Sequence, residues 1–334
     1  MVEISLHGMI SKIEISHKTI IFTLVLLASI WFVLQIRDIL FLVFIAFIIM
    51  STFKPTVDWM VSKRMPRLLA TILIYIVVFG VVGFSIAGTI PSLVAEITGF
   101  TQAFPNIISN MLPHLNLDLN SFSQQLAPIG QNILKVTISI FSNVVAVGMV
   151  MVFSFYFLLE RKHAEKIVTG FVGRERATSF IDVVERIEGR LGSWMLGQLF
   201  LMITVGLLSY VGLLLLGVKF ALPLAIIAGL LEIVPNIGPI VSAIPAILIA
   251  LSISPVTGLS VGILYLVIQQ LENNLIVPLI MKKSVGLSPI ITIFSLLVGS
   301  KLAGITGAVL AIPILLIIQE LIQALTGEKE IKKN

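Results

Sequence analysis

Two glutamates in the C-terminal third of the sequence interrupt otherwise apolar stretches. Glu232 lies three residues before Pro235, and Glu272 follows Gln269 and Gln270 within the apolar run 258–281. Moving a charge to the centre of a bilayer costs at least about 2.5–3.5 kcal/mol, so such groups usually face the interior of a helix bundle and serve a function. A carboxylate in that position binds a proton or a cation, and we expect this chemistry here.

Further polar side chains accompany these two acids. Gln269, Glu272 and Asn273 stand at i, i+3 and i+4, which places them on one face of an α-helix. The candidate substrate- or ion-binding residues are Glu232, Asn236, Gln269, Gln270, Glu272, Asn273 and Lys301. Two simpler interpretations stay open: Glu272 as a structural acid bonded to a broken helix end, and Lys301 as a residue near the opposite membrane interface.

The sequence shows no arrangement of residues typical of an enzyme or a metal centre. It contains no cysteine, and its four histidines lie at separated positions outside the apolar runs. Intramembrane proteolysis needs paired catalytic groups such as two aspartates, and only Asp38 lies near a span. We therefore predict no catalytic residue, no metal, no cofactor and no enzymatic activity.

Composition places these residues in a membrane protein. Hydrophobic residues make up 57% of the chain and charged residues 12%, with a mean hydropathy of +1.10. A soluble domain carries about 25% charged residues, so this chain has too few to cover its surface in water. The bilayer is the expected partner. The net charge of +5 comes without a basic tract, so we expect no nucleic acid partner.

Apolar runs recur along the chain, and a helix of about 20 such residues crosses a membrane. The runs are 19–36, 39–53, 68–90, 136–159, 193–216, 221–253, 258–281 and 287–325. The first two are separated only by Arg37 and Asp38 and predict a helical hairpin, with a single bent helix as the alternative. The predicted fold is an all-α integral membrane protein, a polytopic helical bundle.

Basic residues predict the orientation of the chain. Residues 54–67 contain four basic residues and one acid, and 160–190 contain seven basic residues, whereas 91–135 contain only Lys135. Basic loops remain in the cytoplasm. We therefore predict that 54–67, 160–192, Lys282–Lys283 and both termini are cytoplasmic, in a multi-pass protein of the inner (plasma) membrane.

Two long apolar runs in the C-terminal half are interrupted. Two prolines four residues apart break the run 221–253, and each half, at about 22 Å, is too short to cross a core of about 30 Å. The run 287–325 is interrupted by glycines. We expect two broken, re-entrant helical hairpins, whose break or hinge residues are Pro235, Gly238, Pro239, Pro278, Gly299, Gly304 and Gly307.

These observations divide the chain into successive segments. We predict N-terminal transmembrane helices over 1–90, an extracytoplasmic segment over 91–135 and a transmembrane helix over 136–159. A cytoplasmic amphipathic segment over 160–192 precedes a C-terminal transmembrane core with the two hairpins over 193–325, and 326–334 form a cytoplasmic tail.

Short blocks follow one another in the last third of the chain: 231–239, 244–246, 270–273, 276–278, 285–289 and the final break with 311–313. Together they resemble the autoinducer-2 exporter family of prokaryotic membrane proteins. The resemblance implies a homo-oligomeric permease, with a pentamer as one expectation. It also implies that Glu232, Pro235, Gly238 and Pro239 form the first break, that Gln270, Glu272 and Asn273 form a polar span beside it, and that Gly299, Gly304 and Gly307 form the second.

Three functions follow as hypotheses. The first is a secondary transporter that exports a small polar solute, such as a quorum-sensing signal, by alternating access around the two broken hairpins. The second is a sodium/proton antiporter, in which Glu232 or Glu272 alternately binds a proton and a cation. The third is a non-transporting membrane scaffold that binds partners through 160–191 or 91–135.

Overall fold

The computed structural model describes residues 17–81, 83–84, 144–235, 237–281 and 288–326, which form helices and no strands. Five of the helices are long and apolar enough to cross a membrane, and many of their large apolar side chains are exposed. The predicted all-α polytopic membrane fold is confirmed. The predicted segment 91–135, Lys282–Lys283 and nearly all of the tail 326–334 lie outside the described residues.

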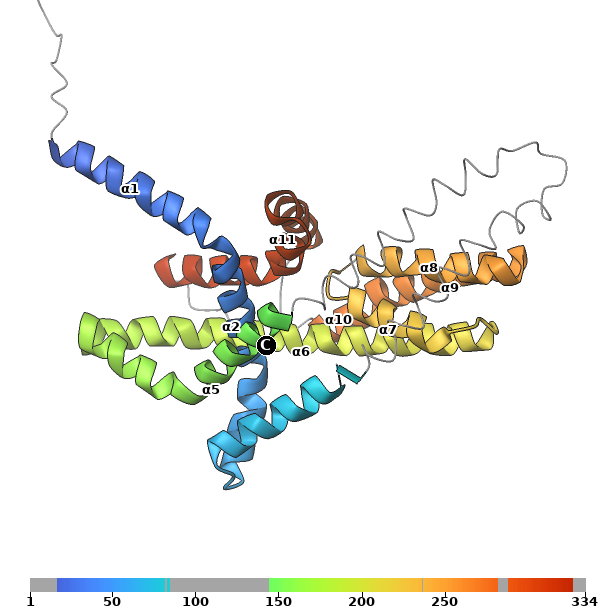
Figure 1. Ribbon diagram of the computed structural model, residues 1–334, viewed down its shortest axis with the longest axis horizontal. Helices are drawn as coiled ribbons and strands as arrows, with labels where there is room; N and C mark the ends of the chain where they lie inside the picture. Colours follow the sequence, from blue (N-terminus) through green and yellow to red (C-terminus); the bar gives the residue numbers. More distant parts are fainter. Residues whose placement is uncertain (1–16, 82, 85–143, 236, 282–287, 327–334) are drawn as a thin grey trace, which may run out of the picture. The chain divides into compact units, whose positions relative to one another are not determined.

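A single turn residue, Ile36, separates the first two helices. α1 spans His17–Gln35 and α2 spans Arg37–Ser62 (Figure 1). At the junction the Ile36 amide donates to the Phe32 carbonyl, and the Leu40 amide donates to the Ile36 carbonyl. These two i to i−4 bonds bridge the junction, and the charged pair Arg37 and Asp38 forms the first turn of α2. The hairpin prediction is wrong here, and the bent helix is correct, because Arg37 and Asp38 are compatible with helical backbone.

The middle of the chain folds around a core of α2, the helix Arg67–Val81 and α5, which spans Val144–Val172. Its buried side chains are Met50, Val57, Ala70, Ile74, Tyr75 and Leu158. Tyr75 and Ser154 share a hydrogen bond of 2.5 Å, and Arg67 donates to the carbonyl of Leu158 at 2.8 Å. These contacts bind the helix Arg67–Val81 to α5.

The predicted amphipathic segment 160–192 is not a separate element. α5 extends to Val172, the chain turns at Gly173 with φ 83°, and α6 spans Arg174–Leu215 without interruption. The 42 residues of α6 make a helix about 63 Å long, roughly twice the thickness of the hydrocarbon core. Its charged first half therefore extends beyond the apolar half that crosses the membrane.

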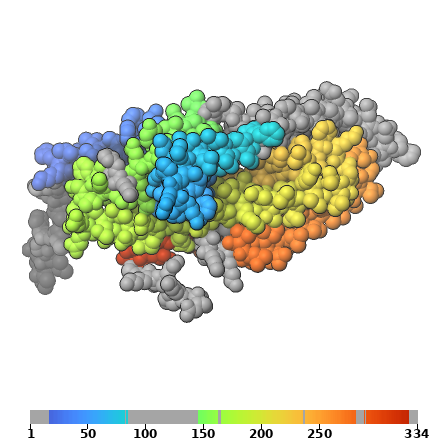
Figure 2. All heavy atoms as spheres, turned by 90° about the horizontal axis from the view of Figure 1, so that it is seen from below, coloured from blue at the N-terminus to red at the C-terminus, as the bar shows by residue number. Residues whose placement is uncertain are grey.

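The C-terminal core packs against the second half of α6. α7 spans Ala221–Leu231, α8 spans Ile237–Ile253 and α9 spans Pro255–Leu271. α7 and α9 pack against α6, and α8 packs against α7 and α9 (Figure 1), while the space-filling view shows the orange residues of this core beside the yellow ones (Figure 2). The packing is close, because a Cβ at Gly229 would approach the Met202 carbonyl to 2.7 Å.

The first predicted break is present. α7 and α8 have 11 and 17 residues, or about 16 and 26 Å, so neither crosses the hydrocarbon core alone. Gly238 fits the junction because a Cβ there would overlap the backbone of Leu231 and Glu232. Pro239 lies in the first turn of α8, where a missing amide proton is tolerated. Re-entry into the membrane stays a prediction.

The second predicted break is also present. α11 spans Pro289–Thr326 and loses helical geometry at Ala303 and Gly304, where Gly304 has φ 60° and ψ −139°. Its two arms meet at Gly299 and Gly307, since a Cβ on either glycine would overlap the carbonyl oxygen of the other. Val234 of the first break packs with Leu296, Ala308 and Ala311 of α11, which brings the two broken segments together.

Candidate functional site

The two predicted glutamates come together in the C-terminal core. Glu232 is the residue that ends α7 and is 0% exposed, and Glu272, at the end of α9, is 2% exposed. Their carboxyl groups are close enough to interact directly. Both oxygens of Glu232 and Oε2 of Glu272 nevertheless have no well-formed hydrogen bond. The pair is therefore an unsatisfied acidic site.

No basic residue in the described part of the chain forms an ion pair with either carboxyl group. The ion pairs among the described residues involve acids other than Glu232 and Glu272. Two carboxylates that share a buried site cannot both stay ionised without a compensating charge. A proton or a bound cation is therefore required to neutralise this pair.

The helix that carries Glu272 changes geometry at this residue. A π-helix, η1, spans Glu272–Ile276 and leads into α10, Val277–Met281. The wider turn shifts the side chains that follow it, and single π-turns within α-helices often occur at functional sites. Of the three residues predicted to share a face, Glu272 is buried, Gln269 is half-buried and Asn273 is exposed.

The remaining predicted site residues do not join the pair. Gln269 is half-buried, whereas Gln270 and Lys301 are exposed. Asn274 is also exposed, and its side chain donates to the carbonyl and the side chain of Gln270, both at 2.9 Å. Asn236 lies outside the described residues. Pro278 lies exposed in α10.

One further polar residue of the site was not predicted. Gln198 of α6 is 0% exposed, and its Nε2 donates to the backbone carbonyl of Glu232 at 2.6 Å. That bond holds the end of α7, where the carbonyl has no partner in a following helical turn. The side-chain oxygen of Gln198, Oε1, has no hydrogen-bond partner. The only signal in the sequence was a single amide within an apolar run.

A second polar pair lies between α6 and α9. The hydroxyl groups of Ser209 on α6 and Tyr265 on α9 are neighbours, yet neither makes a well-formed hydrogen bond. All the buried side-chain atoms that lack a partner in the described part of the chain belong to these two groups, on α6, α7, α9 and η1. The unsatisfied polarity is thus concentrated in the C-terminal core.

Comparisons with known proteins agree with a membrane transport role. A family described as "AI-2E family transporter" matches residues 20–327. The chain is 27% identical to "Putative transport protein YueF" of Bacillus subtilis over 86% of this chain and 84% of that protein. It is 25% identical to YrrI of the same organism, over 88% and 89%, and 24% identical to YhhT of Escherichia coli, over 83% and 82%.

Proposed function

Because the chain belongs to the AI-2E transporter family, we propose that it is a cation-coupled secondary transporter whose coupling site is the Glu232–Glu272 pair. The observation that carries the proposal is two neighbouring buried carboxyl groups with no basic partner among the described residues. Sodium/proton antiport is the simplest activity of such a pair, since protons and a cation can neutralise it in turn.

The oxygen atoms of the site suit a small hard cation. The two carboxyl groups and Oε1 of Gln198 supply oxygen atoms that lack hydrogen-bond partners. Helix ends exposed by a break supply further carbonyl groups, and in other transporters such carbonyls coordinate sodium ions. A cation bound here would displace the protons that otherwise neutralise the pair.

The position of the site between two broken helices provides a route for alternating access. Val234, two residues after Glu232, packs on both arms of α11 through Leu296 and Ala308. A movement of one broken segment against the other would change the surroundings of Glu232 without disrupting long helices. Irregular backbone at membrane depth is tolerated where it is buried or lines a wet cavity.

Ion flux in reconstituted vesicles tests this function. Full-length protein is placed in vesicles that contain a pH-sensitive dye, and sodium chloride is added outside. We expect the interior to become alkaline, because sodium enters as protons leave, and choline chloride should give no response. Glu232→Gln and Glu272→Gln should reduce the rate to that of empty vesicles. Glu175→Gln, at an exposed acid in the first turn of α6, is the matched control.

Two results would contradict coupling at this pair. One is a wild-type protein whose proton flux does not respond to sodium. The other is a Glu272→Gln variant that exchanges ions at the rate of Glu175→Gln.

A second candidate function is the export of a small polar solute. The polar residues Gln270, Asn273 and Asn274 are exposed beside the site, within a span that is otherwise apolar. A solute path along this face would require such side chains. Sodium-independent release of a polar metabolite from loaded vesicles, reduced by Asn273→Leu, would favour export over ion exchange.

A further inference from the structure

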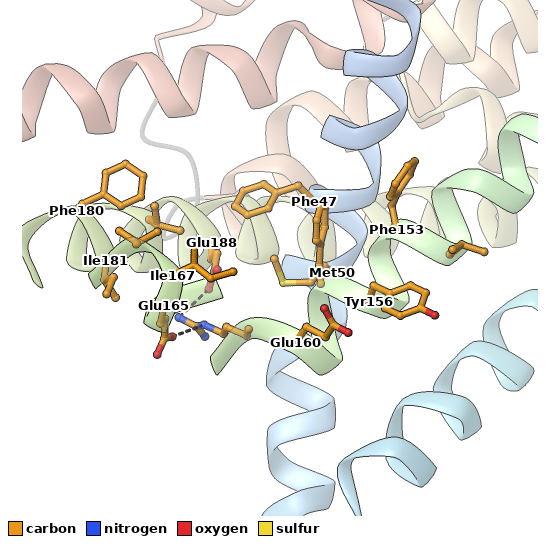
Figure 3. Close-up of a pocket in the computed structure, with 15 residues that line it drawn as sticks. Phe47, Met50, Phe153, Tyr156, Glu160, Glu165, Ile167, Phe180, Ile181 and Glu188 are labelled. Atoms are coloured by element: carbon orange, nitrogen blue, oxygen red, sulfur yellow. Dashed lines mark ion pairs between the residues drawn. The ribbon is translucent and has the colours of Figure 1, made fainter. Parts of the chain in front are cut away.

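A separate pocket of about 650 Å³ lies between α2, the end of α5 and the charged half of α6. None of its lining residues belongs to the Glu232–Glu272 site. Its volume is typical of sites that enclose a drug-sized molecule. Figure 3 shows its labelled side chains around a common space.

The walls of this pocket are mainly apolar, and a third of the lining residues are aromatic. Its aromatic side chains are Phe47, Phe153, Tyr156, Phe157 and Phe180, and Met50 adds a flexible thioether. Aromatic faces attract cations, most strongly when both groups are removed from water. These walls can therefore hold an apolar body and a positive charge together.

Acidic groups outnumber basic groups on the described lining. Glu160, Glu165 and Glu188 line the pocket together with one guanidinium, that of Arg161. Arg161 already forms ion pairs, because its side chain lies 3.2 Å from Glu165 and 3.2 Å from Glu188. It also lies 2.7 Å from Glu185, which is outside the lining.

Glu160 supplies the uncompensated charge. Lys54 bonds to Glu188 at 2.7 Å, so this nearby cation is also engaged. Glu160 forms no ion pair with any described residue, and its side chain lies between Met50 and Tyr156 in the view of Figure 3. A positively charged ligand would neutralise the charge of Glu160, whereas an anionic ligand would be repelled by it.

We propose that this pocket binds an amphipathic organic cation, a molecule with one delocalised or quaternary positive charge and an aromatic or branched apolar body. The charge would lie near Glu160, and the body would pack on the aromatic walls. This inference does not depend on the proposed coupling site, because the pocket shares no residue with it.

Two probes of similar shape and opposite charge test the proposal. Tetraphenylphosphonium and tetraphenylborate are each titrated into full-length protein in nanodiscs of zwitterionic lipid, with empty nanodiscs subtracted. We expect saturable binding of the cation, at least about tenfold tighter than that of the anion at low salt, as charge complementarity across a partly exposed site predicts. Equal affinity for both probes would overturn the proposal.

Variants at exposed positions test whether the cation binds in this pocket, and they leave the buried core unchanged. Glu160→Lys should remove the preference for the cation, and Phe180→Ala, at a side chain 56% exposed, should weaken binding several-fold. Glu175→Gln lies outside the lining and should leave the affinity unchanged. Unchanged affinity in both pocket variants would contradict the proposal, as would a co-purified phospholipid that fills the pocket and excludes the cation in native mass spectrometry.

Discussion

At the scale of single residues, the buried carboxyl groups of Glu232 and Glu272 dominate the energetics of the C-terminal core. Each is 2% exposed or less, and neither has a basic partner among the described residues. Burial of such groups is unfavourable for folding unless they are neutralised. Their presence is best explained by function, because an amide or an apolar side chain would fill the same space at a smaller cost.

Glu272→Gln should therefore keep or raise the stability of the folded protein. Replacing one of the two adjacent acids by an amide removes the cost of burying and neutralising that acid, and we expect an increase in the free energy of unfolding of about 0–2 kcal/mol at neutral pH. Thermal unfolding of purified protein in detergent measures the change, with Glu175→Gln as control. A clear fall in the melting temperature would instead support the alternative that Glu272 is a structural acid.

The sequence identified both glutamates because a charge stands out in an apolar run. It did not identify Gln198, since a neutral amide in a span is common and its partner, the Glu232 carbonyl, is distant in sequence. It also did not predict the π-helix at Glu272–Ile276, because the local sequence there contains no proline or glycine before Pro278. A charged residue within an apolar run can be recognised from the sequence. The helices that pack around that residue cannot, because they are distant along the chain.

At the scale of helices, the arms of α11 depend on two glycines that touch. A Cβ at Gly299 would overlap the Gly307 carbonyl, so Gly299→Ala should separate the arms and lower stability by about 1–3 kcal/mol. Gly189→Ala is the matched control, because nothing lies within 4 Å of a Cβ there. Chemical denaturation monitored by tryptophan fluorescence measures both. Equal stability of the two variants would show that the contact is unimportant.

The first helical break predicts a second result. If α7 and α8 re-enter the membrane, residue 236 never reaches the cytoplasm. The chain contains no cysteine, so Asn236→Cys provides a clean background for labelling in inverted membrane vesicles. We expect no reaction with a membrane-impermeant maleimide, which reaches only the cytoplasmic side of these vesicles. Ready labelling from that side alone would contradict re-entry, and Lys63→Cys serves as the cytoplasmic reference.

Helix breaks were predictable because proline and glycine act locally on the backbone. The continuity of α1 with α2 was not, since the pair Arg37–Asp38 looked like a loop between two spans yet lies within helical backbone. The length of α6 was also missed. Charged and apolar residues occupy its two halves, no proline marks their boundary, and Gly189 and Gly192 there lie within the continuous helix.

At the scale of the whole molecule, ion pairs join the basic segments that were predicted to share one side. Lys54 bonds to Glu188 at 2.7 Å, and Arg190 bonds to Glu320 of α11 at 2.8 Å. These ion pairs bring together residues of 54–67, of 160–192 and of the last turns of α11, just before the tail 326–334. The positive-inside rule predicts that 54–67, 160–192 and the tail lie in the cytoplasm.

Labelling from opposite sides tests this arrangement. Lys63→Cys, Glu175→Cys and Thr326→Cys should all react with an impermeant maleimide in inverted membrane vesicles, and all three should be protected in intact cells. Reaction of any one of them in intact cells would place that segment outside and contradict the common cytoplasmic side.

Proton release on cation binding tests the central claim most directly. Purified protein in a weakly buffered detergent solution is titrated with sodium chloride, and the released protons are followed with a pH indicator. If Glu232 and Glu272 exchange protons for a cation, the wild type and Glu175→Gln should release protons saturably, and choline chloride should release none. Glu232→Gln and Glu272→Gln should show little or no release. Release that persists unchanged in both variants, or is absent from the wild type, would contradict the assignment of this pair as the coupling site.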